Sequence, residues 1–268
     1  MSLVVTLPPH ADEAIRQFLR VNGEPPESNG YVVGLSGGID SALTARLARD
    51  AVGADRVLAL LIPDSEHPTD LETDTQSYAR ELGIEERVLR IHQPETALES
   101  LVPPTADRVT RGNFRARLRM AILYAFARDT GRRVLGTGNK SEILLGYFTK
   151  HGDGGVDLLP LGDLYKTQVR QLARALALPQ KFLDRVPTAG FWAGQTDEGE
   201  LGHSYDDLDR ILLGLERLWR PEEIANALNL PRSVIDEVAQ RVAVNRHKRR
   251  LPPIPKLSLR TVGIDWRD

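Results

Sequence analysis

The sequence predicts an α/β protein with a doubly wound, mainly parallel sheet, helices on both faces of that sheet, and a helical C-terminal part. Two observations support this fold class. Short apolar runs alternate with stretches of helical periodicity through the first half of the chain, which is typical of βαβ units. The runs are continuously apolar, as in "VLALLI" at 57–62, and this character suits strands that are covered on both faces.

The expected elements follow in order along the chain. A helix at 11–21 ends before Gly23 and two prolines, which stop a helix. The first strand leads through a glycine turn into a helix whose apolar positions are spaced for one buried face. A loop at 63–69 separates the second strand from the next helix. The strands lie at 31–35, 57–62, 87–91 and 133–136, and the helices between them at 40–52, 71–82 and 112–130.

The pattern changes after the fourth strand. A glycine-rich stretch at 146–167 interrupts the helices, and a second long loop covers 187–204. Long irregular stretches inside a compact domain usually carry function. The helices expected in this part lie at 164–176, 205–218, 222–228 and 233–246. The 268 residues are enough for one large α/β domain or two small ones.

The composition argues against several function classes. The formal net charge is −2, so no global basic field points to DNA or RNA as a partner. The absence of cysteine excludes disulfides, thiolate metal sites and a cysteine nucleophile. The N-terminus lacks the features of a signal peptide, and no apolar run reaches the roughly 20 residues that span a bilayer. We therefore expect a cytoplasmic enzyme without membrane or nucleic-acid partners.

The stretch "GLSGGIDS" at 34–41 joins the first strand to the helix after it. The glycines at 37 and 38 allow a ligand to approach the backbone and permit positive φ angles. The serine hydroxyls can hydrogen-bond a ligand, and the amides at a helix N-terminus favour an anion. A tight turn with Asp40 or Ser41 as the helix N-cap is the simpler alternative.

Asp40 stands where a phosphate-binding loop usually has a lysine. An ionised aspartate about 4 Å from a phosphate charge repels it by about 1 kcal/mol in water and about 4 kcal/mol at an effective dielectric of about 20. A cation between the two removes this repulsion, and Mg²⁺ binds one or two carboxylates together with phosphate oxygens. The loop therefore predicts a second carboxylate elsewhere that completes a Mg²⁺ site.

The loop "SGGIDSAL" resembles the pyrophosphatase loop of the N-type ATP pyrophosphatases, which cleave ATP to AMP and pyrophosphate while they activate a carboxylate or carbonyl. Four further segments are similar to the ammonia-dependent NAD synthetases, in the same order and over nearly the whole chain: "GNFRARLRMAILYAFA", "GTGNKSEILLGYFTKHGDGGVDLLPLGDLYKTQV", "PTAGFWAGQTDEGELG" and "NRHKRRLPP". The resemblance implies an adenine nucleotide α-hydrolase-like fold. It also implies a single NAD synthetase domain at 1–268, with a nucleotide-binding core at 24–160, a helix-rich part at 161–268, and no glutaminase domain.

The resemblance implies an ATP site. It assigns Mg²⁺ to Asp40 and Glu142, and it has Lys166 hold the ATP phosphates and stabilise the charge on the leaving pyrophosphate. Taken alone, Glu142 is a charge at a helix N-terminus and Lys166 a solvated lysine. The implied ATP-binding residues are Gly34, Leu35, Ser36, Gly37, Gly38, Ile39, Asp40, Ser41, Thr137, Lys166 and Thr188.

The resemblance also implies a site for deamido-NAD. Asp153, in "TKHGDGGVD", would be catalytic by positioning ammonia or accepting its proton, because ammonia attacks only when deprotonated. The glycines beside it suggest a loop that closes over the substrate and excludes water. A glycine-rich turn and a basic helix end are the alternatives for these segments. The implied substrate-binding residues are Arg117, Lys150, Asp157, His247 and Lys248.

The helix at 112–130 carries several arginines. A helix turns about 100° per residue, so Arg115 and Arg119 share a side while Arg117 points nearly opposite. In similar enzymes this helix builds a large dimer interface where the dinucleotide binds, so we expect a homodimer. A solvated basic face is the alternative.

The function expected from the resemblance is an ATP-dependent amidation. ATP adenylates the nicotinate carboxylate of deamido-NAD, pyrophosphate leaves, and ammonia then attacks to give NAD and AMP. The ammonia would come from solution or from a separate glutaminase. Two alternatives stay open: another adenylating amide synthetase similar to GMP synthetase, and a nucleotide-binding regulator without turnover. A regulator would lack the metal pair or Lys166, and both are present.

Overall fold

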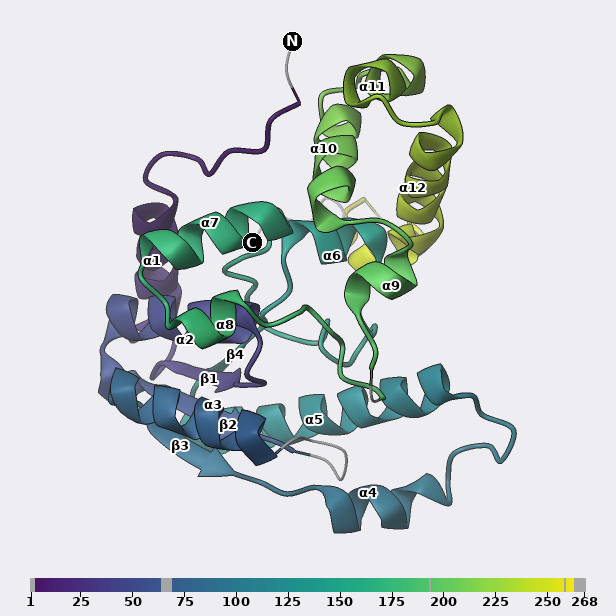
Figure 1. The fold of residues 1–268 in the computed structure, drawn as a ribbon. Coiled ribbons are helices and arrows are strands. Elements are labelled where there is room, and N and C mark those ends of the chain that lie inside the picture. Colours follow the sequence, from purple (N-terminus) through teal and green to yellow (C-terminus); the bar gives the residue numbers. More distant parts are fainter. Residues whose placement is uncertain (1–2, 64–68, 193, 258, 263–268) are drawn as a thin grey trace.

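The computed structural model describes residues 3–63, 69–192, 194–257 and 259–262, and these residues form the α/β fold that the sequence predicts (Figure 1). The strands are β1 Tyr31–Gly34, β2 Val57–Leu61, β3 Glu85–Val88 and β4 Arg133–Leu135. They form one parallel sheet in the order β3-β2-β1-β4. Because β1 and β4 are neighbours, the loops that follow these two strands meet at the same edge of the sheet.

Helices cover both faces of the sheet, as the doubly wound prediction requires. In the first half they are α1 Ala11–Gly23, α2 Ile39–Val52, α3 Thr69–Leu82, α4 His92–Glu99 and α5 Arg108–Thr130, with a 3₁₀ turn, η1, at Ala54–Arg56. In the second half they are α6 Lys140–Leu145, α7 Lys166–Ala175, α8 Gln180–Leu183, α9 Asp197–Leu201, α10 Tyr205–Glu216, α11 Pro221–Leu228 and α12 Arg232–Val244, with the 3₁₀ helix η2 at Asn245–Arg249. Alternate strand residues face opposite sides, so that Tyr31 and Val33 pack with α1, α2, α3, α7 and α8, whereas Val32 packs with α5.

The C-terminal part has its own apolar core. α10, α11 and α12 pack together with α6 around Tyr205, Ile211, Ile224 and Ile235. In Figure 1 these helices stand as a group beside the sheet, and α6 and α7 connect them to it. None of the helices in the described ranges is long and apolar enough to cross a membrane.

Several elements differ from the predicted ones. β3 begins at Glu85 and ends at Val88, because pairing with β2 sets its register, and its edge position leaves alternate residues exposed in place of an apolar run. α5 begins before residue 112, because Asp107 caps it by accepting the Thr110 amide at 2.8 Å. α4 lies where no element is predicted, and α9 lies inside the predicted loop at 187–204. Of the predicted loop at 63–69, residues 64–68 lie outside the described part, and Thr69 begins α3.

Candidate active site

A cavity of about 930 Å³ lies beyond the carboxyl ends of β1 and β4, which is where open α/β sheets bind ligands. The glycine loop, α5, α7 and the segment 185–197 contribute to its wall. The residues expected to bind ATP, Mg²⁺ or ammonia all line it: Gly34, Leu35, Ser36, Gly37, Gly38, Ile39, Asp40, Ser41, Thr137, Glu142, Asp153, Lys166 and Thr188. Of the five residues expected to bind the dinucleotide, Lys248 lines the cavity, and Arg117, Lys150, Asp157 and His247 do not.

The glycine loop has an internal network of hydrogen bonds. The Ser36 amide donates to Ser41 Oγ at 3.2 Å, and the Ser41 hydroxyl donates to the Gly38 carbonyl at 3.0 Å. Gly37 has a φ of +80°, and a Cβ there would lie 2.3 Å from Leu71 Cδ1, so this position requires glycine. Gly38 does not have the positive φ that we expected, because it is the N-cap of α2 with extended backbone. Asp40 and Ser41 therefore lie inside the first turn, and the N-cap alternative for them is wrong.

The loop brings Asp40 to Lys166 and Glu142. Lys166 Nζ lies 2.5 Å from Asp40 Oδ2 and 3.3 Å from Glu142 Oε1. The lysine side chain is 2% exposed, and the two carboxylate side chains are each 16% exposed. Burial acts to lower the pKa of Lys166, but the two carboxylates raise it above its usual value, so the side chain stays an ammonium. Burial raises the pKa of Glu142, Lys166 opposes this shift, and the negative charge of Asp40 adds to it.

Asn139 holds the two carboxylates in place from the start of α6. Its side-chain oxygen accepts the Glu142 amide at 3.1 Å, and Glu142 Oε2 accepts the Asn139 amide at 3.2 Å, which makes a capping box. The Asn139 side-chain amide also donates to Asp40 Oδ1 at 3.0 Å. Asn139 is not among the expected site residues, although "NKSE" has the N-cap and N3 spacing that could have found it.

The pair Asp40 and Glu142 fits a magnesium ion. Two carboxylates that lie against the same ammonium are hard oxygen donors, and Mg²⁺ is usually held by one or two carboxylates and completed by phosphate oxygens and water. Within the ranges that the structure describes, no group of three or more His, Asp or Glu side chains forms a complete metal cage. A cation at this place would therefore need oxygen ligands from a substrate or from water.

Arg185 is a second residue that the sequence analysis misses. It donates to the Gly37 carbonyl at 2.5 Å and to Asp74 Oδ2 at 3.1 Å, and it lines the cavity. The carbonyl and the amide of one planar trans peptide point in opposite directions. With the Gly37 carbonyl held by Arg185, the Gly38 amide points away from the guanidinium, and it donates to Ser36 Oγ at 3.4 Å within the loop.

Asp197 and Tyr205 also lie near Lys166. The Tyr205 hydroxyl donates to Asp197 Oδ2 at 3.1 Å, and Lys166 Nζ lies 5.4 Å from the centre of the Tyr205 ring. Burial raises the pKa of Asp197, and the nearby Lys166 lowers it. Asp197 lines the cavity and is 4% exposed, so a third acidic side chain adjoins the pair Asp40 and Glu142.

The segment 146–157 contacts the basic 3₁₀ helix η2. Asp153 Oδ1 accepts the Thr149 amide at 2.8 Å, which closes a turn and leaves the aspartate at the cavity. Lys150 Nζ donates to the His247 carbonyl at 3.0 Å, and Lys248 Nζ donates to the carbonyls of residues 146 and 148 at 2.6 and 2.9 Å. These bonds bring Lys150, His247 and Lys248 close together.

Asp157 and Arg117 also lie outside the lining of the cavity. Asp157 accepts the Val134 amide at 2.7 Å and the Tyr124 hydroxyl at 3.1 Å, so its carboxylate supports the edge strand β4. Arg117 is exposed on α5, whereas Arg115 is buried and pairs with Glu95 at 3.2 Å. The arginines of α5 therefore point to different sides, as their spacing predicts.

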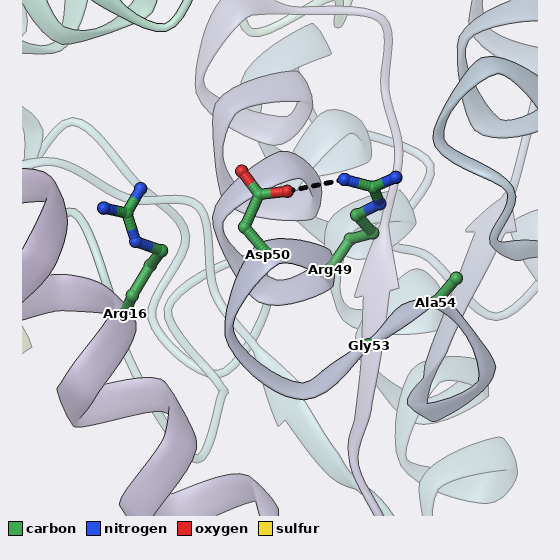
Figure 2. A pocket seen from close by; sticks show the side chains of 5 residues that line it. All are labelled: Arg16, Arg49, Asp50, Gly53 and Ala54. Atoms are coloured by element: carbon green, nitrogen blue, oxygen red, sulfur yellow. Dashed lines mark hydrogen bonds and ion pairs between the residues drawn. The ribbon is translucent and has the colours of Figure 1, made fainter.

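Figure 2 shows another cavity, of about 530 Å³, at the amino edge of the sheet. It is lined by Arg16, Arg49, Asp50, Gly53 and Ala54. Arg16 is paired with Asp12 at 2.6 Å, and Arg49 is paired at 2.9 Å with Asp50, which also binds Arg46 at 2.7 Å. None of the expected site residues lines this cavity.

Comparison with known proteins identifies the family of the chain. The chain matches the NAD synthase family over residues 12–252. It is 45% identical over 251 residues to an NH(3)-dependent NAD(+) synthetase of Methanosarcina mazei, and the match covers 92% of this chain and 98% of that protein. Its fold is similar to that of an NMN synthetase from Francisella tularensis, with a TM-score of 0.81, 33% identity, and coverage of 92% of this chain and 98% of that one. It is also similar to an NH3-dependent NAD synthetase from Campylobacter jejuni solved with a nitrate ion, with a TM-score of 0.77, 32% identity, and the same coverage of 92% and 98%. The chain therefore belongs to the NAD synthase family, together with the NH3-dependent NAD(+) synthetases.

Proposed function

We propose that this chain is a ligase that uses ATP and ammonia to convert deamido-NAD into NAD, with AMP and pyrophosphate as the other products. The main observation behind this proposal is that Asp40, Glu142 and Lys166 meet in a cavity lined by the glycine loop. This arrangement offers amides and hydroxyls for phosphates, two carboxylates for a divalent cation, and one ammonium for the charge that develops on leaving pyrophosphate. The family membership supports the same reaction.

The residues of the cavity have separate tasks in this proposal. The loop 36–41 binds the ATP phosphates, Thr137 and Thr188 contact the nucleotide, and Lys166 stabilises the leaving group. Mg²⁺, when held by Asp40 and Glu142, would neutralise the phosphate charge that these carboxylates otherwise repel. Asp153, which also lines the cavity, holds ammonium or accepts its proton.

The segment that follows Arg185 excludes water in this proposal. Phe191 and Trp192 line the cavity, and Arg108 stacks on the Trp192 ring with the guanidinium carbon 4.1 Å from its centre. A wall of this kind matters because water would hydrolyse an acyl adenylate before ammonia reaches it.

The position of the dinucleotide residues supports a homodimer. Arg117, Lys150, Asp157 and His247 lie outside the cavity lining, and Arg117 is exposed on α5. We propose that deamido-NAD extends from the cavity across α5 onto a second copy of the chain, with the basic residues near its phosphates. We further propose that residues 1–268 act as one domain in the cytoplasm, without nucleic acid, on free ammonia or ammonia from a separate glutaminase.

Pyrophosphate release tests this function. Purified protein with ATP, Mg²⁺, deamido-NAD and ammonium should release pyrophosphate and form NAD, and omission of ammonium should prevent NAD formation. Release that does not depend on deamido-NAD would favour another adenylating synthetase. No release by folded protein would favour a non-catalytic regulator and refute the proposal.

Amidation of the mononucleotide is a second candidate. The similarity in fold to an NMN synthetase, with a TM-score of 0.81, favours it. The two substrates differ by the adenylate half, which the dinucleotide residues outside the cavity would bind. Parallel measurement of kcat/KM for deamido-NAD and for the deamido form of NMN separates them, and Arg117→Ala should lower the value only for a dinucleotide that reaches α5.

A further inference from the structure

A buried carboxylate behind the cavity connects the helices that carry the proposed catalytic groups. Asp209 lies on α10 with 0% of its surface exposed, and it is not part of the cavity lining. A buried carboxylate is costly unless hydrogen bonds replace the lost water. Its partners therefore identify what the side chain contributes.

The two oxygens of Asp209 accept from two different helices. Oδ1 accepts the Ser141 hydroxyl of α6 at 2.5 Å. Oδ2 accepts both the amide and the hydroxyl of Thr167 of α7, each at 2.8 Å. Ser141 Oγ in turn accepts the Lys166 amide at 2.9 Å. One carboxylate on α10 thus ties α6 to α7.

These bonds satisfy the N-terminus of α7 from outside the helix. The first amides of a helix have no partner within it. Here the amide of Lys166 is satisfied by α6 and that of Thr167 by α10. The hydroxyl of the preceding residue, Tyr165, donates a hydrogen bond to Glu216 Oε2 at 2.6 Å. The start of α7 is therefore placed by its neighbours.

The residues that Asp209 holds are adjacent to the proposed catalytic ones. Ser141 precedes Glu142, and Thr167 follows Lys166. Tyr205 lies one turn before Asp209 on the same face of α10, and its ring is 5.4 Å from Lys166 Nζ. α10 therefore contacts Lys166 at its charged end through Tyr205 and constrains its backbone through Asp209.

We propose that Asp209 is a positioning residue, which holds α7 against α6 and thereby places Lys166 Nζ beside Asp40 and Glu142. This inference rests on the proposed roles of Lys166 and Glu142, and it adds the residue that sets their geometry. Misplacement of a catalytic group by about 1 Å can cost on the order of 100-fold in rate. The shared anchor explains how helices from different parts of the chain meet within hydrogen-bonding distance.

The test compares Asp209→Asn with a matched acid on the same helix. Asn keeps the shape but supplies one acceptor oxygen where three donors need acceptors. We expect kcat for pyrophosphate release to fall about 10- to 100-fold, with KM for deamido-NAD within about 2-fold of the wild type. Asp206→Asn, an exposed position of α10, should leave both constants unchanged. Ser141→Ala removes the bond from α6 to Asp209 and also the acceptor of the Lys166 amide, and it should lower kcat by about 3- to 10-fold.

A double-mutant cycle separates positioning from general stability. If Asp209 acts through Lys166, then Asp209→Asn should cause no further loss of kcat in a Lys166→Met background, as measured by single-turnover pyrophosphate release. The same fold-loss in both backgrounds would overturn the proposal, and so would a wild-type kcat of folded Asp209→Asn. Should that variant not fold, a wild-type kcat of Ser141→Ala would overturn it.

The outcome also distinguishes this inference from the roles on which it rests. Full activity of Lys166→Met alone would refute the role of Lys166, and the inference about Asp209 would fall with it. An inactive Lys166→Met together with a fully active Asp209→Asn would overturn the inference alone. A loss in both single variants without a further loss in the double variant would support both.

Discussion

Lys166→Met is expected to lower both the stability and the activity of the protein. Lys166 is 2% exposed and lies within 3.3 Å of both Asp40 and Glu142, and Met has a similar volume without the charge. Removal of one partner from a buried ion pair costs about 3–5 kcal/mol, because the remaining charge stays buried without compensation. Since the two carboxylates are each 16% exposed, some water reaches them, and we expect the lower end of that range, about 3 kcal/mol.

The assay is unfolding in urea and on heating, followed by circular dichroism in EDTA. For a chain of this size, about 3 kcal/mol corresponds to a decrease of about 6–12 °C in Tm. Addition of Mg²⁺ should return part of the loss, since a cation bound by the carboxylates of the folded state stabilises that state. In the activity assay, loss of a group that stabilises developing charge should lower kcat by about 100-fold or more.

Lys140→Met is the matched control. Lys140 Nζ also has two acidic partners, Asp163 at 3.0 Å and Glu216 at 2.8 Å, but these partners are 98% and 46% exposed. Exposed pairs contribute about 0–1 kcal/mol. If Lys166→Met destabilises the protein no more than Lys140→Met, the cluster around Lys166 is not a buried ion network and the reasoning fails.

Removal of metal and three substitutions test other parts of the site. EDTA should stop pyrophosphate release, and Mg²⁺ should restore it. Asp40→Asn should lower kcat by about 100-fold or more at every Mg²⁺ concentration. Normal turnover in either experiment would contradict a metal beside Asp40. Gly37→Ala should lower the free energy of unfolding, measured in urea, by about 1–3 kcal/mol, because the new Cβ would lie 2.3 Å from Leu71 at a φ of +80°. An unchanged stability would show that the loop can adopt another conformation. Arg185→Ala should raise KM for ATP about 10-fold and leave KM for deamido-NAD unchanged, because the guanidinium holds the Gly37 carbonyl of the phosphate loop. An equal rise in both KM values would argue against this role.

The features that the sequence predicts best are contiguous or follow from the sheet. Strand β1, the glycine loop and α2 are consecutive in the chain, so local spacing was enough to predict the loop and the positive φ of Gly37. Lys166 is 126 residues from Asp40, yet it lies beside it because the connections after β1 and β4 open at one edge of a parallel sheet. The edge strand β3 was misplaced because half of its residues face solvent, which removes the apolar signal.

The residues that hold the proposed catalytic groups were not predicted, because their contacts are distant in sequence. Ser141 and Asp209 are 68 residues apart, and Gly37 and Arg185 are 148 apart. Asp209 could nevertheless have been noticed in the sequence. It is four residues after Tyr205 and three before Leu212, which places an acid on the apolar face of α10. Nothing in the sequence indicates Arg185 in this way, since its segment before α9 has no periodicity against which a charged residue would stand out.

The position of Lys166 in α7 supports the proposed use of its charge. It is the first residue of that helix, where the macrodipole disfavours a cation, whereas Asp40, in the first turn of α2, lies where the dipole favours an anion. Two features offset the cost at α7: the Asp209 carboxylate at the same helix end, and the carboxylates of Asp40 and Glu142 at the ammonium. With Asp197 included, three acidic side chains that line the cavity surround one lysine, so incoming phosphates would meet an excess of negative charge unless a cation accompanies them. The same charge distribution therefore supports the proposal that ATP binds together with a divalent cation.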